Sequence, residues 1–156
     1  MTRQREQLLR TTQRRMLRQI VGTRRRPLIN EAGDRTLENW VDWIQRATRE
    51  AEDAMCKFCI SDWVAEVCKR KFGWAGHVCR RQDGRWSRQV LNWCPVGWRD
   101  RGHPLMRWRD SFTSFFDNVS AAMTQHIDWM ALAEDRDAWN ALEEQFVLHC
   151  SGRGSS

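Results

Sequence analysis

Apolar residues recur at steps of three and four along most of this chain, which is the spacing that places side chains on one face of an α-helix. The first such segment covers residues 3–21 and ends before Gly22, a residue type favoured just beyond a helix C-terminus. Its apolar positions are Leu9, Met16, Leu17, Ile20 and Val21. Residues 23–34 then include Arg26-Pro27, and proline disfavours helix at the residue before it. We therefore predict a helix over 3–21 and a linker over 23–34.

The same periodicity predicts two further helices before the middle of the chain. Thr36 is a suitable N-cap for a helix of about 20 residues, and Glu38 is placed to favour its N-terminal dipole. The apolar stripe of that helix is Trp40, Ile44, Ala47, Ala51, Ala54 and Phe58. Asp62, or the serine before it, caps the next helix. The apolar set of this third helix is Trp63, Val64, Val67, Phe72, Trp74 and Val78. Gly73 and Gly76 weaken it, because glycine costs about 1 kcal/mol relative to alanine inside a helix.

The second half of the chain is less regular at its start and helical afterwards. A turn signal at residues 82–85 precedes a segment without a clean period, which predicts a short helix and then an irregular loop around residues 86–103. Pro104 can open the next helix, and the segment 118–120 (Asn-Val-Ser) breaks its pattern. The apolar positions of that helix are Leu105, Trp108, Phe112, Phe115 and Phe116. One or two final helices cover residues 128–149. Their predicted buried residues are Trp129, Leu132, Trp139, Leu142 and Phe146.

These segments predict an all-α fold, because no alternation with a period of two persists anywhere and no internal repeat is present. The expected architecture is an irregular bundle of about five to six helices. A chain of 156 residues is about the size of one domain. We divide it into a basic helix and linker over 1–30, a helical module over 31–150 and a disordered tail over 151–156.

Several classes of protein are disfavoured by what the sequence lacks. No apolar run approaches the roughly 20 residues needed to cross a bilayer, and the N-terminus leads into arginines rather than an apolar signal region. We therefore expect an intracellular protein, nuclear or cytoplasmic, and not a secreted or membrane protein. GxSxG, phosphate-binding glycine loops and the aromatic-x-Asp-Asp polymerase motif are absent from the sequence. We expect no enzymatic activity, no cofactor and no small-molecule substrate.

Arginine and tryptophan make the composition unusual. Only three of the 26 basic residues are lysine, and the chain has ten tryptophans but no tyrosine. Codon bias in a GC-rich genome explains this as well as nucleic-acid binding does. The net charge of +6 is uneven, with +8 over residues 1–30, −3 over 31–70, +6 over 71–110 and −5 over 111–156. Either basic and acidic faces pair with each other, or a basic face is left for phosphate.

The stretch from Trp98 to Asp110 is the main candidate for phosphate contact. It holds a glycine, which lets a backbone approach a partner closely, and a proline that starts a helix whose free amides suit phosphate oxygens. Arginine pairs bidentately with phosphate. The arginines of this stretch are Arg99, Arg101, Arg107 and Arg109. Trp98 could stack on a base, whereas Trp108 falls on the apolar stripe and is expected in the core. The same residues also suit an ordinary loop and helix start.

The cysteines offer a candidate metal site. Cys56 and Cys59 form a CxxC, and His77 and Cys79 form a second pair of zinc-type ligands. Their spacing is not that of a zinc finger, and the CxxC falls inside a helical pattern, so we expect free thiols and no bound metal. A disulfide framework is not expected without a secretory signal.

Five short motifs stand in a notable order along the chain. They are Arg14 to Gly22 (RRMLRQIVG), Phe72 to Val78 (FGWAGHV) with Arg80 or Arg81, Asp83 to Trp86 (DGRW), Arg101 to Pro104 (RGHP) with Trp108 and Asp110, and Ala133 to Trp139 (AEDRDAW). In this order they resemble the region that follows the polymerase core in reverse transcriptases of non-LTR (LINE-type) retrotransposons. The resemblance spans about residues 13–147. His103 stands where that family usually has arginine.

The resemblance implies a thumb-to-C-terminal region that helps hold template RNA or target DNA. RNA or DNA is therefore the expected partner, together with the polymerase core, whose catalytic aspartates this chain lacks. The predicted phosphate contacts are Arg14, Arg15, Arg18, Arg24, Arg25, Arg26, Arg80, Arg81, Arg85, Arg88, Arg99, Arg101, Arg107 and Arg109. The predicted stacking residues are Trp86 and Trp98. The alternative is a structural or protein-interaction helical domain, a truncated retroelement remnant whose arginines pair with its own acidic helices.

Overall fold

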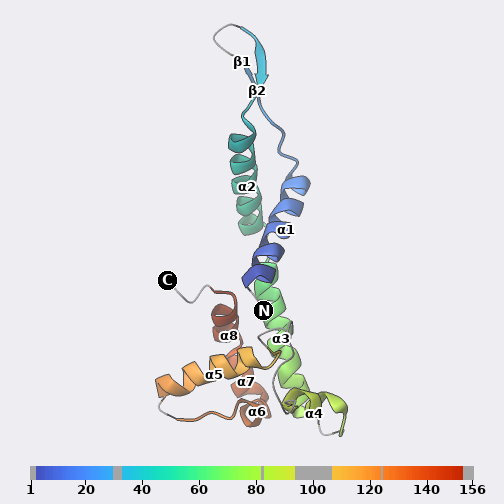
Figure 1. Ribbon diagram of the computed structural model, residues 1–156, viewed down its shortest axis with the longest axis vertical. Helices are drawn as coiled ribbons and strands as arrows, with labels where there is room; N and C mark the ends of the chain where they lie inside the picture. Colours follow the sequence, from blue (N-terminus) through green and yellow to red (C-terminus); the bar gives the residue numbers. More distant parts are fainter. Residues whose placement is uncertain (1–2, 30–32, 82, 94–106, 124, 153–156) are drawn as a thin grey trace, which may run out of the picture. The chain divides into compact units, whose positions relative to one another are not determined.

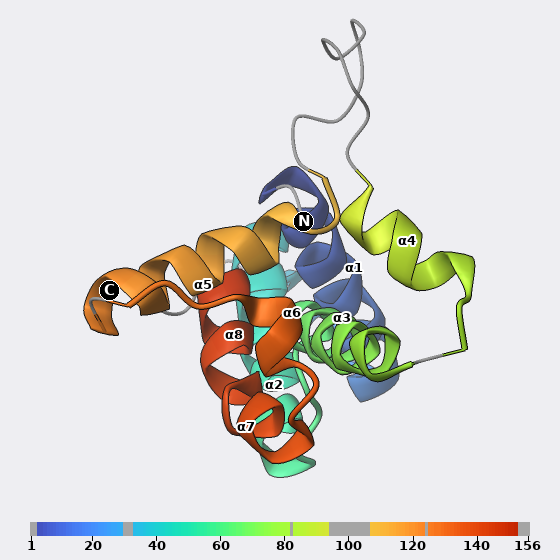
Figure 2. The same cartoon turned by 90° about the horizontal axis from the view of Figure 1, so that it is seen from below.

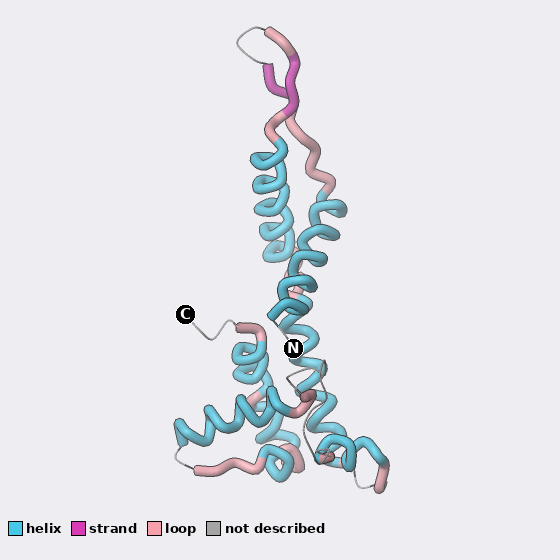
Figure 3. Tube along the Cα trace, in the orientation of Figure 1, coloured by secondary structure: helices cyan, strands magenta, loops and turns pink. Residues whose placement is uncertain are grey.

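The computed structural model describes residues 3–29, 33–81, 83–93, 107–123 and 125–152, and within them the chain is predominantly helical (Figure 1). Its elements are α1 (Arg3–Val21), β1 (Pro27–Ile29), β2 (Arg35–Leu37), α2 (Trp40–Lys57), α3 (Trp63–Arg80), α4 (Trp86–Asn92), α5 (Asp110–Met123), α6 (Trp129–Leu132), α7 (Arg136–Ala141) and α8 (Glu143–Cys150). In this described part the only sheet is one two-stranded ribbon (Figure 3). The prediction of an all-α class is confirmed, with a small ribbon added.

The chain forms two compact units, which we call the N-terminal unit (Gln4–Trp63) and the C-terminal unit (Val64–Ser156, with which Met1–Arg3 are also grouped). The N-terminal unit contains α1, the ribbon and α2, and the C-terminal unit contains α4 to α8 with nearly all of α3. Each unit has its own buried apolar side chains. None of the described helices is long and apolar enough to cross a membrane.

The N-terminal unit joins α1 and α2 along a narrow seam. Leu17 on α1 and Ala47 and Ala51 on α2 are buried, and small side chains let two helix backbones approach closely. Arg18 Nη1 also donates a hydrogen bond to Thr48 Oγ1 at 3.1 Å. The outer members of the predicted stripes are exposed, namely Ile20, Trp40 and Phe58. The helical pattern was therefore right, but the buried face is narrower than it predicts.

Gln13 connects α1 to the start of α3. Its side chain is buried, its Nε2 donates to the Ser61 carbonyl at 2.7 Å, and its Oε1 accepts from the Trp63 amide at 3.0 Å. The first amides of a helix lack partners within the helix. Gln13 therefore supplies one of the bonds that fix where α3 begins.

The segment predicted as a linker forms the antiparallel ribbon. Its strands pair Pro27 with Leu37, Leu28 with Thr36 and Ile29 with Arg35. All six residues are exposed, so no alternation of apolar and polar positions marks the strands in the sequence. The α2 N-cap is Asn39, whose Oδ1 accepts from the Val41 amide at 2.8 Å. The prediction of Thr36 as the N-cap is wrong, because Thr36 lies in β2.

Glu38 and Arg46 hold the ribbon against α2. Arg46 Nη2 lies 2.6 Å from Glu38 Oε2, and Arg46 Nη1 lies 3.1 Å from Glu50 Oε1. The hydrogen bond from Arg46 lowers the pKa of Glu38 to about 2. Arg25 Nε donates to the Glu38 carbonyl at 2.8 Å, and the Thr23 hydroxyl donates to Glu50. Glu38 thus pairs with a specific arginine and does not occupy the first turn of the helix.

The helices α3, α5, α6, α7 and α8 lie together in the C-terminal unit (Figure 2), and their aromatic rings form its core. Phe72 stacks on Trp139 with 4.1 Å between ring centroids and 10° between planes. Phe112 stacks on Phe146 at 4.7 Å and on Trp129 at 5.0 Å. The predicted burial of Trp129, Trp139 and Phe146 in the final helices is confirmed. The two leucines predicted with them, Leu132 and Leu142, are half-buried.

The helix α5 runs through residues 118–120, where the sequence predicts a break. The Ser120 hydroxyl accepts a hydrogen bond from the Ile127 amide at 3.1 Å. This polar side chain therefore holds the segment that follows α5 instead of ending the helix. Pro104, which was expected to open this helix, lies outside the described residues.

The first residue of the predicted tail is the C-cap of α8. Ser151, the first residue of that tail, is buried, and its hydroxyl donates to the Leu148 carbonyl at 3.4 Å. Residues 153–156 lie outside the described part of the chain.

Candidate nucleic-acid interface

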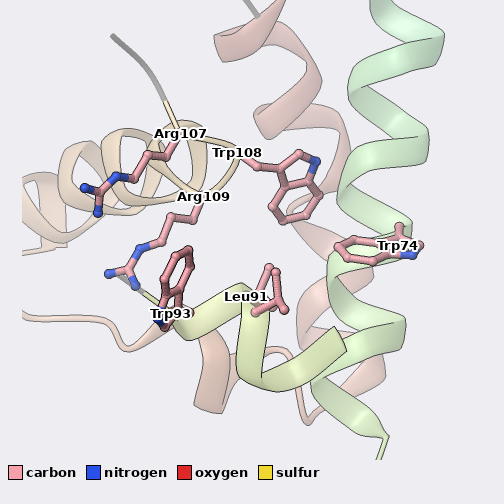
Figure 4. Close-up of a pocket in the computed structure, with 7 residues that line it drawn as sticks. Trp74, Leu91, Trp93, Arg107, Trp108 and Arg109 are labelled. Carbon is pink, nitrogen blue, oxygen red and sulfur yellow. The ribbon is translucent and has the colours of Figure 1, made fainter. Parts of the chain in front are cut away.

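A pocket of about 150 Å³ opens in the C-terminal unit between α3, α4 and the residues just before α5 (Figure 4). It is lined by Trp74, Val90, Leu91, Trp93, Arg107, Trp108 and Arg109. Three indoles and two arginines therefore meet at one place. Aromatic rings stack on bases, and guanidinium groups pair with phosphate, so the lining has the chemistry of a nucleic-acid contact.

The Trp108 ring links the pocket to the aromatic core. Its centroid lies 5.1 Å from that of Phe112 and 4.8 Å from that of Trp74, and the Trp74 and Trp108 planes meet edge-on at 78°. Trp108 is 41% exposed and Trp74 is 47% exposed. The expectation that Trp108 is a core residue is wrong, because only part of its ring is covered by the core.

Trp93 lines the pocket from the end of α4, where it is the C-cap. Figure 4 shows Trp93 and Trp74 on opposite sides of Leu91. Leu91 is buried, whereas Trp93 is 66% exposed. Sequence reasoning missed both tryptophans as site residues, because Trp74 fits an apolar stripe and Trp93 lies in a segment without a period. The excess of tryptophan in the composition was the only signal.

Arg107 and Arg109 are held by the turn that starts α5. Asp110 accepts a hydrogen bond from the Arg107 amide, and the Asp110 amide donates to the Arg107 carbonyl at 3.2 Å. The Arg109 carbonyl accepts from the Phe112 amide at 2.8 Å. Both arginines are half-exposed, and Figure 4 shows their guanidinium groups on the Trp93 side of the pocket. The structure therefore brings two of the predicted phosphate contacts together with indoles.

Lys71 adds a cation behind the pocket wall. Its Nζ lies 4.8 Å from the Trp108 ring centroid and 5.3 Å from that of Phe112, and it donates to the Ser111 hydroxyl. Burial lowers the pKa of Lys71. An ammonium group over an indole face is favourable by about 0.5–2 kcal/mol. This contact helps fix the Trp108 ring beside the two arginines.

Around α4, the predicted arginines are engaged by nearby carboxylates. Arg85 Nε lies 2.8 Å from Asp83 Oδ2, and Arg88 Nη2 lies 2.9 Å from Glu134 Oε1. Arg81 Nη1 is 4.0 Å from the same Asp83 carboxylate. Exposed pairs of this kind contribute only about 0–1 kcal/mol. A phosphate could therefore replace these carboxylates at low cost.

The Arg80 side chain is bonded within the fold, whereas the Trp86 side chain is exposed to solvent. Arg80 Nη1 donates to the Ala133 carbonyl at 2.9 Å, which ties α3 to the segment before α7. Trp86, at the first position of α4, is 77% exposed. Three other predicted residues, Trp98, Arg99 and Arg101, lie outside the described part of the chain.

The predicted basic surface of the N-terminal unit is only partly open. Arg14 Nε lies 3.0 Å from Glu52 Oε1, and the Arg18 and Arg25 side chains donate to groups on the same unit. Arg15, Arg24 and Arg26 are exposed, as is Arg14 itself. This surface has arginine but lacks the neighbouring indoles of the pocket in the other unit.

The candidate zinc ligands do not form a set. Cys56 and Cys59 are exposed free thiols at the end of α2, and Cys59 has a φ of 52°. His77 is exposed and Cys79 is buried, and burial raises the pKa of Cys79 to about 11. No group of three or more potential ligand side chains is found among the described residues.

Residues from three of the motif segments that carry the resemblance contact one another in the C-terminal unit. Gly76 lies against Trp139, and Arg80 bonds to the Ala133 carbonyl at 2.9 Å. The Trp108 ring lies 4.8 Å from the ring of Trp74, the tryptophan of the FGWAGHV motif, measured between centroids. These motif residues thus build the core and one wall of the pocket, and the same fold positions the arginines before α5.

Comparison with known proteins gives a transposon-derived relative. Over 92 residues the chain is 39% identical to an uncharacterized transposon-derived protein of Caenorhabditis elegans. The match covers 58% of this chain and 33% of that protein, so the chain spans about a third of the length of the curated relative. No protein-family model and no solved structure matches the chain. The similarity supports a transposon origin.

Proposed function

We propose that this chain is a non-catalytic nucleic-acid-binding module, derived from the region after the polymerase core of a non-LTR reverse transcriptase. The observation that carries the proposal is the pocket where Arg107 and Arg109 stand beside Trp74, Trp93 and Trp108. A phosphodiester strand offers what this lining binds, because its phosphates suit guanidinium groups and its bases suit indoles.

The transposon-derived relative and the motif order support the proposed origin. The relative shares 39% identity over 92 residues, and the chain carries FGWAGHV, RGHP and AEDRDAW in the order that resembles non-LTR reverse transcriptases. Two of these motifs meet where Gly76 contacts Trp139. The proposal excludes polymerisation by this chain, because the aromatic-x-Asp-Asp motif is absent from its sequence.

The electrostatics near the pocket also support phosphate binding. The ion pairs of Arg85 with Asp83 and of Arg88 with Glu134 are exposed, and exposed pairs are weak. Binding a polyanion releases counterions, which favours a cluster of arginines even where some already have a carboxylate nearby.

A second candidate function is docking to a protein such as the polymerase core. It is favoured by the N-terminal unit, where Arg14 and Arg46 are paired with carboxylates. The same unit exposes apolar side chains. They are Ile20, Ile29, Leu37, Trp40 and Val41. In this case the arginines of the N-terminal unit would serve its own stability, and nucleic acid would contact only the C-terminal unit.

Fluorescence anisotropy with labelled single-stranded RNA and DNA tests the proposal. We expect binding that falls steeply between about 50 and 200 mM salt, since each phosphate contact adds about one to the slope of log affinity against log salt. Arg109→Glu should weaken binding and reduce that slope. Arg136→Glu is the matched control, because Arg136 is exposed and lines no part of the pocket. Undetectable binding at low salt, or equal losses in both variants, would contradict the proposal.

A further inference from the structure

We infer that the pocket receives one unpaired nucleobase, so that the module prefers single-stranded to double-stranded nucleic acid. This inference rests on the proposed function, because it assigns a ligand class to the same site. The pocket holds about 150 Å³, well below the roughly 300–1,000 Å³ of sites for drug-sized ligands. A space of this size suits one flat ring.

The lining is suited to a ring inside and a negative charge outside. Trp74, Trp93 and Trp108 offer aromatic surface, and Val90 and Leu91 add aliphatic surface. Figure 4 shows Leu91 between Trp74 and Trp93, with the guanidinium groups of the two lining arginines beyond Trp93. A base seated against the Trp93 indole would therefore have its own phosphate on the arginine side.

The charge of the lining selects against other flat or apolar ligands. Among the described residues that line the pocket, none is acidic, and Arg107 and Arg109 are both basic. The Lys71 ammonium lies 4.8 Å from the centre of the Trp108 ring. This positive environment favours a ligand that joins an aromatic ring to an anion, and a nucleotide is such a ligand.

Strand selectivity follows from the shape of the site. A base in a duplex has both faces stacked on its neighbours, so that seating it against the indoles of the pocket requires that it first be unpaired and unstacked. A single strand avoids most of that cost. Stacking of its bases on aromatic side chains then favours the bound strand. We therefore expect the full chain to bind a single strand about tenfold more tightly than a blunt duplex of the same sequence.

Two probes and two variants test this inference on the full chain. The first probe is a single strand, as RNA and as DNA, and the second is the same strand with abasic sites that keep every phosphate. Trp93→Leu removes one indole from the pocket. Trp86→Leu is the matched control, because Trp86 begins the helix that Trp93 caps, is 77% exposed and does not line the pocket. Both positions are exposed, and circular dichroism checks that each variant keeps its helices.

For the parent chain we expect about tenfold weaker binding to the abasic strand and to the duplex, in RNA, DNA or both. Trp93→Leu should lose most of this preference and keep salt-dependent binding, whereas Trp86→Leu should keep the preference. Equal affinities for the intact strand, the abasic strand and the duplex would overturn the pocket inference and leave the proposed function standing. A loss of preference in Trp86→Leu alone would also overturn it. No binding of any probe at low salt would remove the proposed function and the inference together.

Discussion

Trp139 lies directly against the backbone of Gly76. A Cβ atom at Gly76 would stand 2.5 Å from Trp139 Nε1, closer than real Cβ contacts come. The same Nε1 donates to the Phe72 carbonyl at 3.2 Å, one turn earlier on α3. Helix propensity marks Gly76 as unfavourable in α3. The absence of a side chain at this position is what makes room for the Trp139 indole.

Replacing this glycine should destabilise the C-terminal unit. We expect Gly76→Ala to lower the free energy of unfolding by about 1–3 kcal/mol, the usual cost of overpacking a core. Gly73→Ala is the matched control on the same helix, where an added Cβ meets nothing within 4 Å. That variant should raise stability by about 0.5–1 kcal/mol through helix propensity. Urea denaturation measures both, and a neutral Gly76→Ala would contradict the contact.

Arg80 should behave as a structural residue and Arg85 as a surface residue. Arg80→Met removes the hydrogen bond to the Ala133 carbonyl, and we expect a loss of about 1–2 kcal/mol in unfolding free energy. Arg85→Met removes only an exposed ion pair and should change stability by less than about 1 kcal/mol. Thermal denaturation compares the two variants. Equal stabilities would show that the Arg80 bond contributes nothing.

The pair formed by Glu38 and Arg46 should make the N-terminal unit sensitive to acid. The pKa of Glu38 falls from 4.5 to about 2 when it accepts the hydrogen bond from Arg46. A carboxylate with a lowered pKa stabilises the folded state above its unfolded pKa, and this contribution is lost as the pH falls through the folded pKa. The ribbon and α2 should therefore lose protection between about pH 4.5 and pH 2.

Hydrogen exchange of α2 amides across this pH range measures the effect of Glu38. Glu38→Gln should lower protection at neutral pH, because the ion pair is gone, and should flatten the decline on acidification. A carboxyl titration by NMR gives the pKa of Glu38 directly. A Glu38 that titrates near 4.5, its ordinary value, would show that the pair with Arg46 is not formed.

Thiol labelling should separate the cysteines by burial. Cys56 and Cys59 are exposed and should react with iodoacetamide first at pH 8. Burial raises the pKa of Cys79 to about 11, and a hydrogen bond with Cys68 together with burial raises the pKa of Cys150. Since the thiolate is the reactive form, these residues should be labelled only slowly until denaturant is added. Peptide mass spectrometry at timed intervals follows each site, and early labelling of Cys79 would contradict its burial.

The helices and most of the core could be predicted from the sequence because they depend on local periodicity. Phe112 and Phe146, for example, fall on apolar stripes and are both buried. The ribbon could not be predicted in the same way, because all of its side chains are exposed and produce no alternation. The N-cap Asn39 was missed for a related reason, since Thr36 is equally suitable until the ribbon is known to contain it.

The pocket depends on contacts between distant parts of the chain. Trp74, Trp93 and Trp108 come from three separate segments, and only the fold around Phe72 and Phe112 brings them together. The sequence indicated two of the arginines, because a basic stretch before a helix is visible locally. It could not indicate which indoles stand beside them.

The stacking of Phe72 on Trp139 and of Phe112 on Phe146 determines when the aromatic core can form during translation. During synthesis, α3 leaves the ribosome long before the indole that covers it has been translated. Nascent chains must therefore carry uncovered phenylalanines until the residues of α7 and α8 emerge. An mRNA truncated before codon 139 would encode a product whose C-terminal unit cannot complete its core and is therefore susceptible to proteases.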